Sequence, residues 1–401
     1  MSAALQAIEG RDEGRLGDRP AWGAVGAMTL GVFGLVTAEF LPASLLTPMA
    51  ADLGISEGMA GQAVTATAAV AMVTSLLISA ATRRIDRRRV LLAFSVLLIV
   101  SNLMVAFAPG LSWLLLGRVL LGAAIGGFWT MSAAVAMRLV PPALVPRALS
   151  MIFSGVSAAT ILAAPVGSYL GDIIGWRNVF LIATALGVVT LVTQVVTLPS
   201  LAPSGESRLR TLVEVLIRPG VGLGMLAAML VFTGHFAFFT YIRPFLETVV
   251  VGISVVSAIL LGFGVANFLG TVLAGRLLER SLRLTLIAMP LLMGILGLGF
   301  VAPVNAAADA VMVVLWGLAF GAVPVAWSTW LTRTVPDQAE SAGGLLVAAV
   351  QLAITIGAAA GGMLFDISGI TGVFTASGLV LLLAGLIIVA GVRPRPSSAA
   401  A

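Results

Sequence analysis

The chain has 401 residues, of which 60% are hydrophobic and 10% are charged, and its formal net charge is +5. Soluble globular domains carry about 25% charged residues, so this chain has too little polar material to cover a surface exposed to water. Most of its outer surface must therefore lie in lipid. The composition predicts an α-helical protein that crosses the membrane many times and excludes an ordinary soluble domain.

Missing residue types exclude several functions. All 22 basic residues are arginine, so a phosphate-binding Walker A loop, which needs a lysine, is excluded. The chain has no cysteine and one histidine, His235, so we expect no disulfide framework, no thiolate chemistry and no multi-histidine metal site. The arginines lie mostly in short connectors, without the interleaved stacking aromatics of a nucleic-acid-binding face. We expect no cofactor, no bound metal, no nucleic-acid partner and no enzymatic activity.

The predicted elements begin after a mixed-charge tail at residues 1–21, which is not typical of a cleaved signal peptide. A membrane-spanning helix needs about 20 mainly apolar residues. Twelve stretches meet this requirement, at residues 22–48, 59–82, 90–108, 111–138, 148–174, 179–198, 221–241, 254–275, 284–301, 311–331, 341–365 and 371–392.

The distribution of arginine predicts the orientation of these spans. If the N-terminus is cytoplasmic, the tails and connectors on the cytoplasmic side hold 19 arginines, whereas the outer connectors hold only Arg177 and Arg243. Arginine and lysine are enriched in cytoplasmic loops of membrane proteins. Both termini are therefore predicted to be cytoplasmic.

The spans fall into two halves that resemble each other. Residues 199–218 form the largest break and predict a cytoplasmic linker between a half at 22–198 and a half at 219–392, with a tail at 393–401. Arg138-Leu-Val-Pro141 recurs as Arg333-Thr-Val-Pro336, and both Arg89 and Arg283 precede a proline by twenty residues. The offsets, 194 and 195 residues, agree. Two parallel repeats predict a substrate site between them near the middle of the membrane.

Four motifs resemble the major facilitator superfamily. The connector after the second span runs from Arg83 to Leu91, although the family usually has Asp and Gly where this chain has Arg83 and Asp86. The other motifs are Leu116–Gly122 around Arg118, Ala164-Pro165-Val166-Gly167, which resembles the drug:proton antiporter branch, and Gly175-Trp176-Arg177. The resemblance implies an all-α fold of twelve transmembrane helices in two pseudo-symmetric halves. It also implies gating roles for Arg83, Asp86, Arg87, Arg88, Pro165 and Gly167.

Three further stretches resemble bacterial purine ribonucleoside efflux transporters of that branch: residues 39–49, 126–129 and 236–244. The resemblance implies proton-coupled export of purine ribonucleosides, such as inosine and guanosine, by a monomer in the bacterial inner membrane. Broader drug or sugar efflux is the alternative within the same fold. A non-transporting membrane sensor is a further alternative, which the short connectors and the lack of a signalling domain disfavour.

Glu39 and Arg118 are the charged residues deepest within predicted spans. A charged residue at the centre of a membrane helix costs roughly 3 kcal/mol on insertion scales, so its presence suggests a function. We predict that Glu39 couples proton or substrate binding to transport. The alternative is that it reaches the outer interface, where Pro42 and Pro48 loosen the helix. Arg118 is predicted to pair with Glu39 or the substrate, or else to satisfy carbonyls of a broken helix.

His235 is predicted to occupy the position in the second half that Glu39 occupies in the first, since each stands nine residues before a proline. Histidine titrates near neutral pH, so His235 is a third candidate for proton handling; the alternative is a hydrogen-bonded polar residue of the cavity. Aromatic rings suit stacking on a base, and mid-helix amides can bond a substrate or a neighbouring helix. These candidate substrate contacts, beside Glu39, are Trp129, Phe238, Phe239, Tyr241, Asn267, Trp327 and Gln351.

Overall fold

The computed structural model describes residues 20–141, 144–202, 209–250, 252–301, 305–335 and 339–392. Within these ranges the regular secondary structure is helical, without a β-strand. Most of the predicted N-terminal tail, the C-terminal tail at 393–401 and residues 203–208 of the predicted linker lie outside the described residues.

The first half contains six long helices and one short helix. Leu45 has non-helical backbone angles, so the predicted first span ends earlier than expected and a short helix follows it. Pro48 in the first turn of α3 accounts for this break, because proline cannot donate a backbone hydrogen bond to the Ser44 carbonyl four residues earlier, and Arg243 donates to that carbonyl instead. The helices are α2 (Trp22–Ser44), α3 (Leu46–Leu53), α4 (Glu57–Ala81), α5 (Arg87–Ala106), α6 (Leu111–Leu139), α7 (Val145–Ile174) and α8 (Trp176–Thr197).

The second half follows α9 (Leu209–Leu216), a short helix in the predicted linker. Two of its long helices are each broken inside the run, α12 at Ser281 and α14 at Gly369. Gly369 has φ of 65°, a left-handed conformation that glycine adopts without steric cost. The helices are α10 (Val221–Thr240), α11 (Ile242–Val249), α12 (Ile253–Gly299), α13 (Ala306–Thr334) and α14 (Ala339–Gly391).

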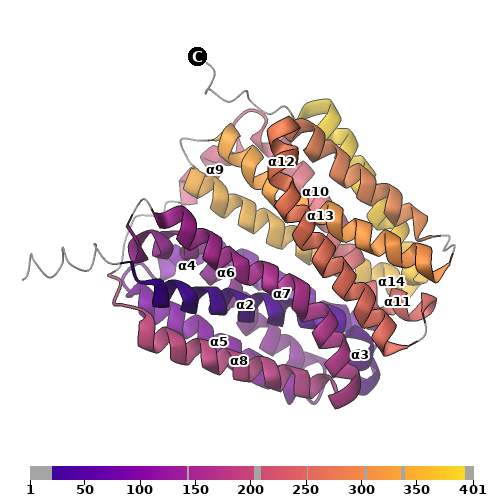
Figure 1. Cartoon of the computed structure of the whole chain (residues 1–401), viewed down its shortest axis with the longest axis horizontal. Helices are drawn as coiled ribbons and strands as arrows, with labels where there is room; N and C mark the ends of the chain where they lie inside the picture. Colours follow the sequence, from indigo (N-terminus) through magenta and orange to yellow (C-terminus); the bar gives the residue numbers. More distant parts are fainter. Residues whose placement is uncertain are drawn as a thin grey trace, which may run out of the picture.

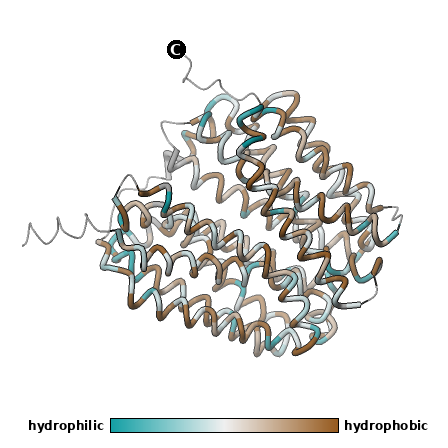
Figure 2. The backbone as a smooth tube through the Cα atoms, in the orientation of Figure 1, coloured by the Kyte–Doolittle hydropathy of each residue, from teal (hydrophilic) through white to brown (hydrophobic). Residues whose placement is uncertain are grey.

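The described helices account for twelve membrane spans. Ten helices are long and apolar enough to cross a bilayer, and α12 and α14 each supply two spans because each is broken near its middle. Figure 2 shows hydrophobic residues along most of each helix and more hydrophilic residues towards the helix ends. The chain is a multi-pass membrane protein, and the predicted twelve-helix fold is confirmed.

The two halves lie side by side, with α2 to α8 in one bundle and α10 to α14 in the other (Figure 1). They meet along two seams, where α4 packs against α14 and α7 packs against α12. Residues at the centre of these seams contact both halves. A site between the two halves would therefore be built from residues of both.

Glycines set the same close contact in each half. A Cβ on Gly122 or Gly126 of α6 would collide with backbone of α4, at Thr67 and Ala71 respectively. Glycines 195 residues later, Gly317 and Gly321 of α13, meet backbone of α12 in the same way. Small residues let membrane helices approach closely, so the glycines explain why α4–α6 and α12–α13 repeat one packing arrangement.

Candidate functional site

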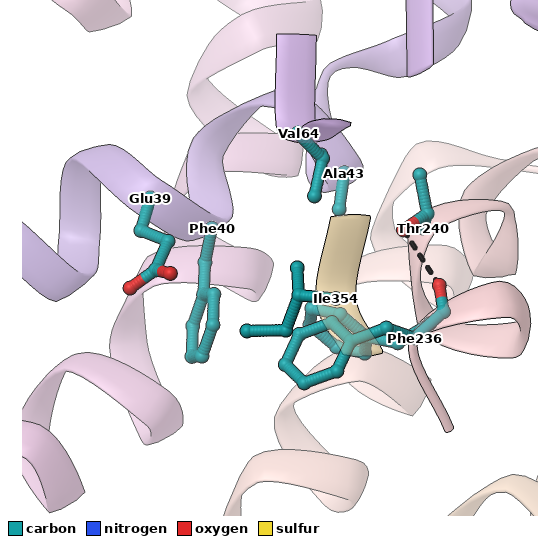
Figure 3. Close-up of a pocket in the computed structure, with 8 residues that line it drawn as sticks. Glu39, Phe40, Ala43, Val64, Phe236, Thr240 and Ile354 are labelled. Carbon is teal, nitrogen blue, oxygen red and sulfur yellow. Dashed lines mark hydrogen bonds between the residues drawn. The ribbon is translucent and has the colours of Figure 1, made fainter. Parts of the chain in front are cut away.

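A small cavity lies between the two halves. Its walls come from α2 and α4 of the first half (Glu39, Phe40, Ala43, Val64) and from α10 and α14 of the second (Phe236, Phe239, Thr240, Ile354). Figure 3 shows the carboxylate of Glu39 beside the ring of Phe40, with Phe236 and Ile354 across the cavity. The free space is about 10 Å³, enough for a single water. An organic solute would therefore fit only after the halves move apart.

Glu39 is the acidic group of this cavity wall. It lies on the last turns of α2 and is partly buried. The side chain of Gln351, on α14 of the opposite half, lies close enough to interact with its carboxylate. The Gln351 amide oxygen is buried and has no hydrogen-bond partner within the described structure. A carboxylate and an unpaired amide oxygen thus meet where the halves face each other, and both can accept a hydrogen bond.

Arg118, on α6, lies next to the end of α2 that carries Glu39, and its side chain is completely buried. Pro42 cannot donate a hydrogen bond to the carbonyl oxygen of Ala38, four residues earlier, and the Nη1 of Arg118 donates to that oxygen at 2.8 Å. The same guanidinium donates to the Ala63 carbonyl of α4 at 3.2 Å and to the Glu39 carbonyl at 3.4 Å. Arg118 therefore joins α2 and α4 through backbone carbonyls, and its charge acts on the Glu39 carboxylate through space.

His235 lies one residue before Phe236, whose ring lines the cavity, and is 2% exposed. Its Nδ1 accepts a hydrogen bond of 3.0 Å from the indole Nε1 of Trp316 on α13. Its ring stacks on Phe320 at a centroid distance of 3.3 Å and is nearly parallel to Phe239 at 5.6 Å. The structure thus brings His235 close to the cavity, but inside an aromatic cluster.

The other predicted substrate contacts divide between cavity and core. Phe239 lines the cavity and meets Phe40 edge to face at 5.4 Å. Phe238 lies in a separate aromatic core, stacked on Trp316 at 4.0 Å. Tyr241 is buried on the α4–α14 seam, where its hydroxyl donates to the carbonyl of Ala358 at 3.0 Å and its ring faces Gly61.

Three further predicted contacts do not line the cavity in this structure. Trp129 stacks on Phe153 of α7 at 5.7 Å. Trp327 is buried against Trp330 on its own helix at 5.4 Å. Asn267 lies on α12, where its backbone carbonyl meets Gly321 of α13.

The sequence prediction missed Phe40, Phe236 and Thr240, which line the cavity. A signal for two of them was present. The offset of 196 residues that relates Glu39 to His235 also relates Phe40 to Phe236. Applying the repeat to the neighbours of Glu39 would have placed both phenylalanines at the site.

The predicted gating residues after α4 contact the start of the linker and the turns around α5. Asp86 caps α5 by accepting from the backbone of Arg88, and it also accepts from the Ser200 hydroxyl at 2.5 Å and the Leu201 backbone at 3.0 Å. Burial raises the pKa of Asp86, but these hydrogen bonds outweigh it and hold the pKa below its usual value. The carboxylate therefore remains charged and ties this connector to the linker.

The arginines next to Asp86 contact residues near the same connector. Arg87 is buried and donates to Thr82 at 2.7 Å, and Arg88 donates to the Val195 carbonyl of α8 at 2.7 Å. Arg83 is exposed.

Pro165 and Gly167, the other predicted gating residues, lie on α7 where it packs against α2. A Cβ on Gly167 would come within 2.7 Å of the Ser44 hydroxyl and 2.8 Å of Leu41. Glycine at this position allows α7 to approach the end of α2 closely. Pro165 stands two residues earlier, inside α7.

Polar contacts close one end of the interface, the end where α3 and α11 lie in Figure 1. Arg243 of the second half is 3% exposed and donates to the Ser44 carbonyl and to the Asp172 carboxylate of the first half, each at 2.6 Å. At the same end, the hydroxyl of Ser56, the N-cap residue of α4, donates to Asp366 of α14 at 3.0 Å. These contacts hold the two halves together on one side of the cavity.

Two helix bundles with a cavity between them, closed at one end, define a membrane carrier. A family model described as Major Facilitator Superfamily matches residues 28–353, and the chain belongs to this superfamily. The predicted family and fold class are therefore confirmed, and the chain is a transporter rather than an enzyme.

Relatives match nearly the whole chain. It is 49% identical over 382 residues to proteins named purine ribonucleoside efflux pump NepI from Salmonella enteritidis and Salmonella gallinarum, covering 95% of this chain and 96% of each relative. Among solved structures, a D-xylose-proton symporter has a TM-score of 0.74 at 19% identity, covering 93% of this chain and 98% of that one. A bacterial homolog of the human lysosomal transporter Spinster also has a TM-score of 0.74, at 16% identity, covering 96% of this chain and 100% of that one.

Proposed function

We propose that this transporter exports purine ribonucleosides such as inosine and guanosine in exchange for protons. Its support is the combination of 49% identity to relatives named purine ribonucleoside efflux pumps with a cavity that joins an acid and aromatic rings from both halves. The rings of Phe40, Phe236 and Phe239 offer faces or edges to a flat base. The Glu39 carboxylate and the unpaired amide oxygen of Gln351 offer acceptors to ribose hydroxyls.

Alternating access is the mechanism that this geometry favours. The cavity is too small for a nucleoside, and the end held by Arg243 is closed, so solute would enter from the other end after the halves separate there. Opening that end moves Gln351 away from Glu39, since the two residues belong to opposite halves. Solute hydroxyls could then replace the amide as partners of the carboxylate.

Proton exchange is assigned to Glu39, with Arg118 as the fixed charge behind it. We propose that Glu39 takes a proton when the site faces outward and releases it inward when solute binds. Arg118 would balance the charge of Glu39 when the carboxylate is deprotonated and would favour release of its proton when it is protonated. It does so from a position already fixed by three backbone carbonyls.

The orientation that we propose places both termini and the linker in the cytoplasm of a bacterial cell, with the closed end outside. It rests on the 19 arginines predicted for the inner side against two for the outer. Reporter fusions after Ala401 and within residues 199–218 should report a cytoplasmic location, and a fusion near Asp309 should report an external one. The opposite pattern would overturn this orientation.

Counterflow in proteoliposomes tests the substrate. Labelled inosine should accumulate in vesicles loaded with unlabelled inosine, and guanosine should compete better than the free bases. A site that bonds hydroxyls rejects analogues without them, by factors of up to about 10⁴. Competition by arabinose alone would favour sugar efflux, and competition by a cationic dye alone would favour drug efflux. Absence of flux with every solute would favour a non-transporting protein.

A further inference from the structure

The hydrogen bond between Trp316 and His235 determines where the imidazole carries its hydrogen. An indole N–H is a donor and has no acceptor lone pair. The His235 nitrogen that it meets, Nδ1, must therefore be the unprotonated acceptor, and the ring hydrogen lies on Nε2. A doubly protonated ring would set two N–H groups against each other across 3.0 Å.

The surroundings hold both rings in this arrangement. Trp316 is fully buried and stacks on Phe238. His235 lies against Phe320 of α13, Phe263 of α12 and Phe239 of its own helix. Tilting either ring out of its present plane would disturb this packing.

No charged side chain contacts His235 within the part of the chain that the structure describes. The rings packed on it from α10, α12 and α13 are uncharged, and α14 places Ser377 and Leu381 against the adjacent Gly234. The titratable group that faces the shared cavity is Glu39 of α2. An imidazolium here would thus be buried without a contacting anion, which is strongly unfavourable.

We propose that Trp316 is a positioning residue that fixes His235 as the neutral tautomer with hydrogen on Nε2. The cavity wall then contains one exchanging proton site, Glu39, and His235, next to the wall residue Phe236, is a polar but uncharged ring. This assignment rests on the proposed function, because it takes Glu39 as the residue that carries the proton of the transport cycle. It replaces the proton-handling role that the sequence suggested for His235.

The single histidine allows a direct test by nuclear magnetic resonance. Protein labelled with ¹⁵N-histidine and purified through a tag without histidine should give one Nε2 signal of protonated type and one Nδ1 signal of unprotonated type. Both should stay constant between about pH 5 and pH 8, where histidine ordinarily titrates. Trp316→Phe keeps an aromatic ring against Phe238 but removes the donor. The His235 ring should then stay uncharged but exchange its hydrogen between Nδ1 and Nε2, so its two nitrogen signals should move towards each other.

Trp330→Phe is the matched control. Trp330 lies on the same helix and is 1% exposed, and its indole nitrogen has no partner in the described structure. This variant should leave the His235 signals unchanged. Titration of the wild-type ring, hydrogen on Nδ1, or an unchanged Nε2 tautomer in folded Trp316→Phe would each overturn the proposal. If Trp316→Phe does not fold, the wild-type spectra still decide it.

Transport supplies a second readout. His235→Gln should leave the shape of the pH profile of efflux unchanged, even if the rate falls. A flattened or shifted profile would overturn the proposal. The resonance measurement does not depend on which solute is exported, so failure of the purine assignment and failure of this inference are distinguishable.

Discussion

At the scale of single residues, the protein places one carboxylate where the two halves meet. Glu39 has a polar neighbour from the opposite half in Gln351 and a buried positive charge beside it in Arg118. A charged group inside a membrane is retained where it serves a function. The contact with Gln351 exists only while the halves are together, so the environment of Glu39 depends on the conformation. This dependence is what a coupling residue requires.

Glu39→Gln should abolish proton-driven efflux, because glutamine has similar size but cannot release a proton. Inosine binding to the purified variant should persist and lose its pH dependence. Efflux from vesicles with an imposed pH gradient and binding at several pH values measure the two effects. Glu279→Gln, at an exposed acid of α12, is the control and should pump normally. Normal pumping by Glu39→Gln would instead show that the proton is carried elsewhere.

Arg118→Lys should destabilise the protein although it keeps the charge, because an ammonium cannot match the guanidinium fork that reaches three carbonyls. Each hydrogen bond to a charged group contributes about 1.5–3 kcal/mol. A clear fall in melting temperature in detergent is expected. Arg88→Lys, which alters a bond to a single carbonyl near the surface, should change it little. Equal melting temperatures for the two variants would contradict this role of Arg118.

At the scale of helices, glycines determine how closely pairs pack. Gly126 of α6 and Gly321 of α13 each lie on the backbone of a partner helix, α4 and α12 respectively. The equivalent contacts in the two halves preserve the repeat despite the divergence of their side chains. The position of Arg118 against the Ala63 carbonyl follows from the same α4–α6 contact.

Gly126→Ala should destabilise the protein, whereas Gly275→Ala should be neutral or stabilising. Helix propensity alone favours alanine over glycine by up to about 1 kcal/mol at both positions. A methyl group on Gly126 collides with Ala71 backbone, while one on Gly275 has open space around it. Overpacking costs typically about 1–3 kcal/mol. Thermal unfolding in detergent compares the variants, and equal stability would argue that α4 and α6 can separate freely.

At the scale of the whole molecule, polar contacts close the two halves at one end, and the central group among them, Arg243, is buried. Arg243 donates to three groups of the first half: the Ser44 carbonyl, the Ser168 hydroxyl and the Asp172 carboxylate. Across the other seam, exposed Asp366 accepts from Ser56. Breaking a buried ion pair by removing one partner costs about 3–5 kcal/mol. Truncation of Arg243 should therefore shift the population towards conformations open at this end.

Labelling of a single cysteine measures this shift, because the chain has no native cysteine. Ser44→Cys introduces a thiol at a side chain that is 1% exposed next to Arg243. Adding Arg243→Gln should speed its reaction with a membrane-impermeant maleimide by about tenfold or more, since each 1.4 kcal/mol is a factor of about ten. Arg177→Gln is the control, because Arg177 pairs with Asp52 within the first half. Equal acceleration by both variants would refute the role of Arg243.

The sequence by itself determined the membrane class, the twelve spans and the family, because lipid requires long apolar helices whatever their packing. It also singled out Glu39 and Arg118, since charges inside apolar runs are conspicuous. The break at Leu45 and the aromatic walls of the cavity were less visible, because phenylalanine is as common in the core as at a site. Phe238 and Phe239, adjacent in sequence, illustrate this: one packs on Trp316 and the other lines the cavity.

Only the tertiary structure decided which side chains meet. Gln351 reaches Glu39 from a helix more than 300 residues away in sequence. Trp316 approaches His235 from another helix, and Arg118 finds the carbonyl that Pro42 leaves free. Such contacts depend on how helices cross and rotate against each other, which is set by small glycine contacts spread over many helices. Local patterns in the sequence carry little information about those rotations, so the partners of each polar group emerge only in the folded molecule.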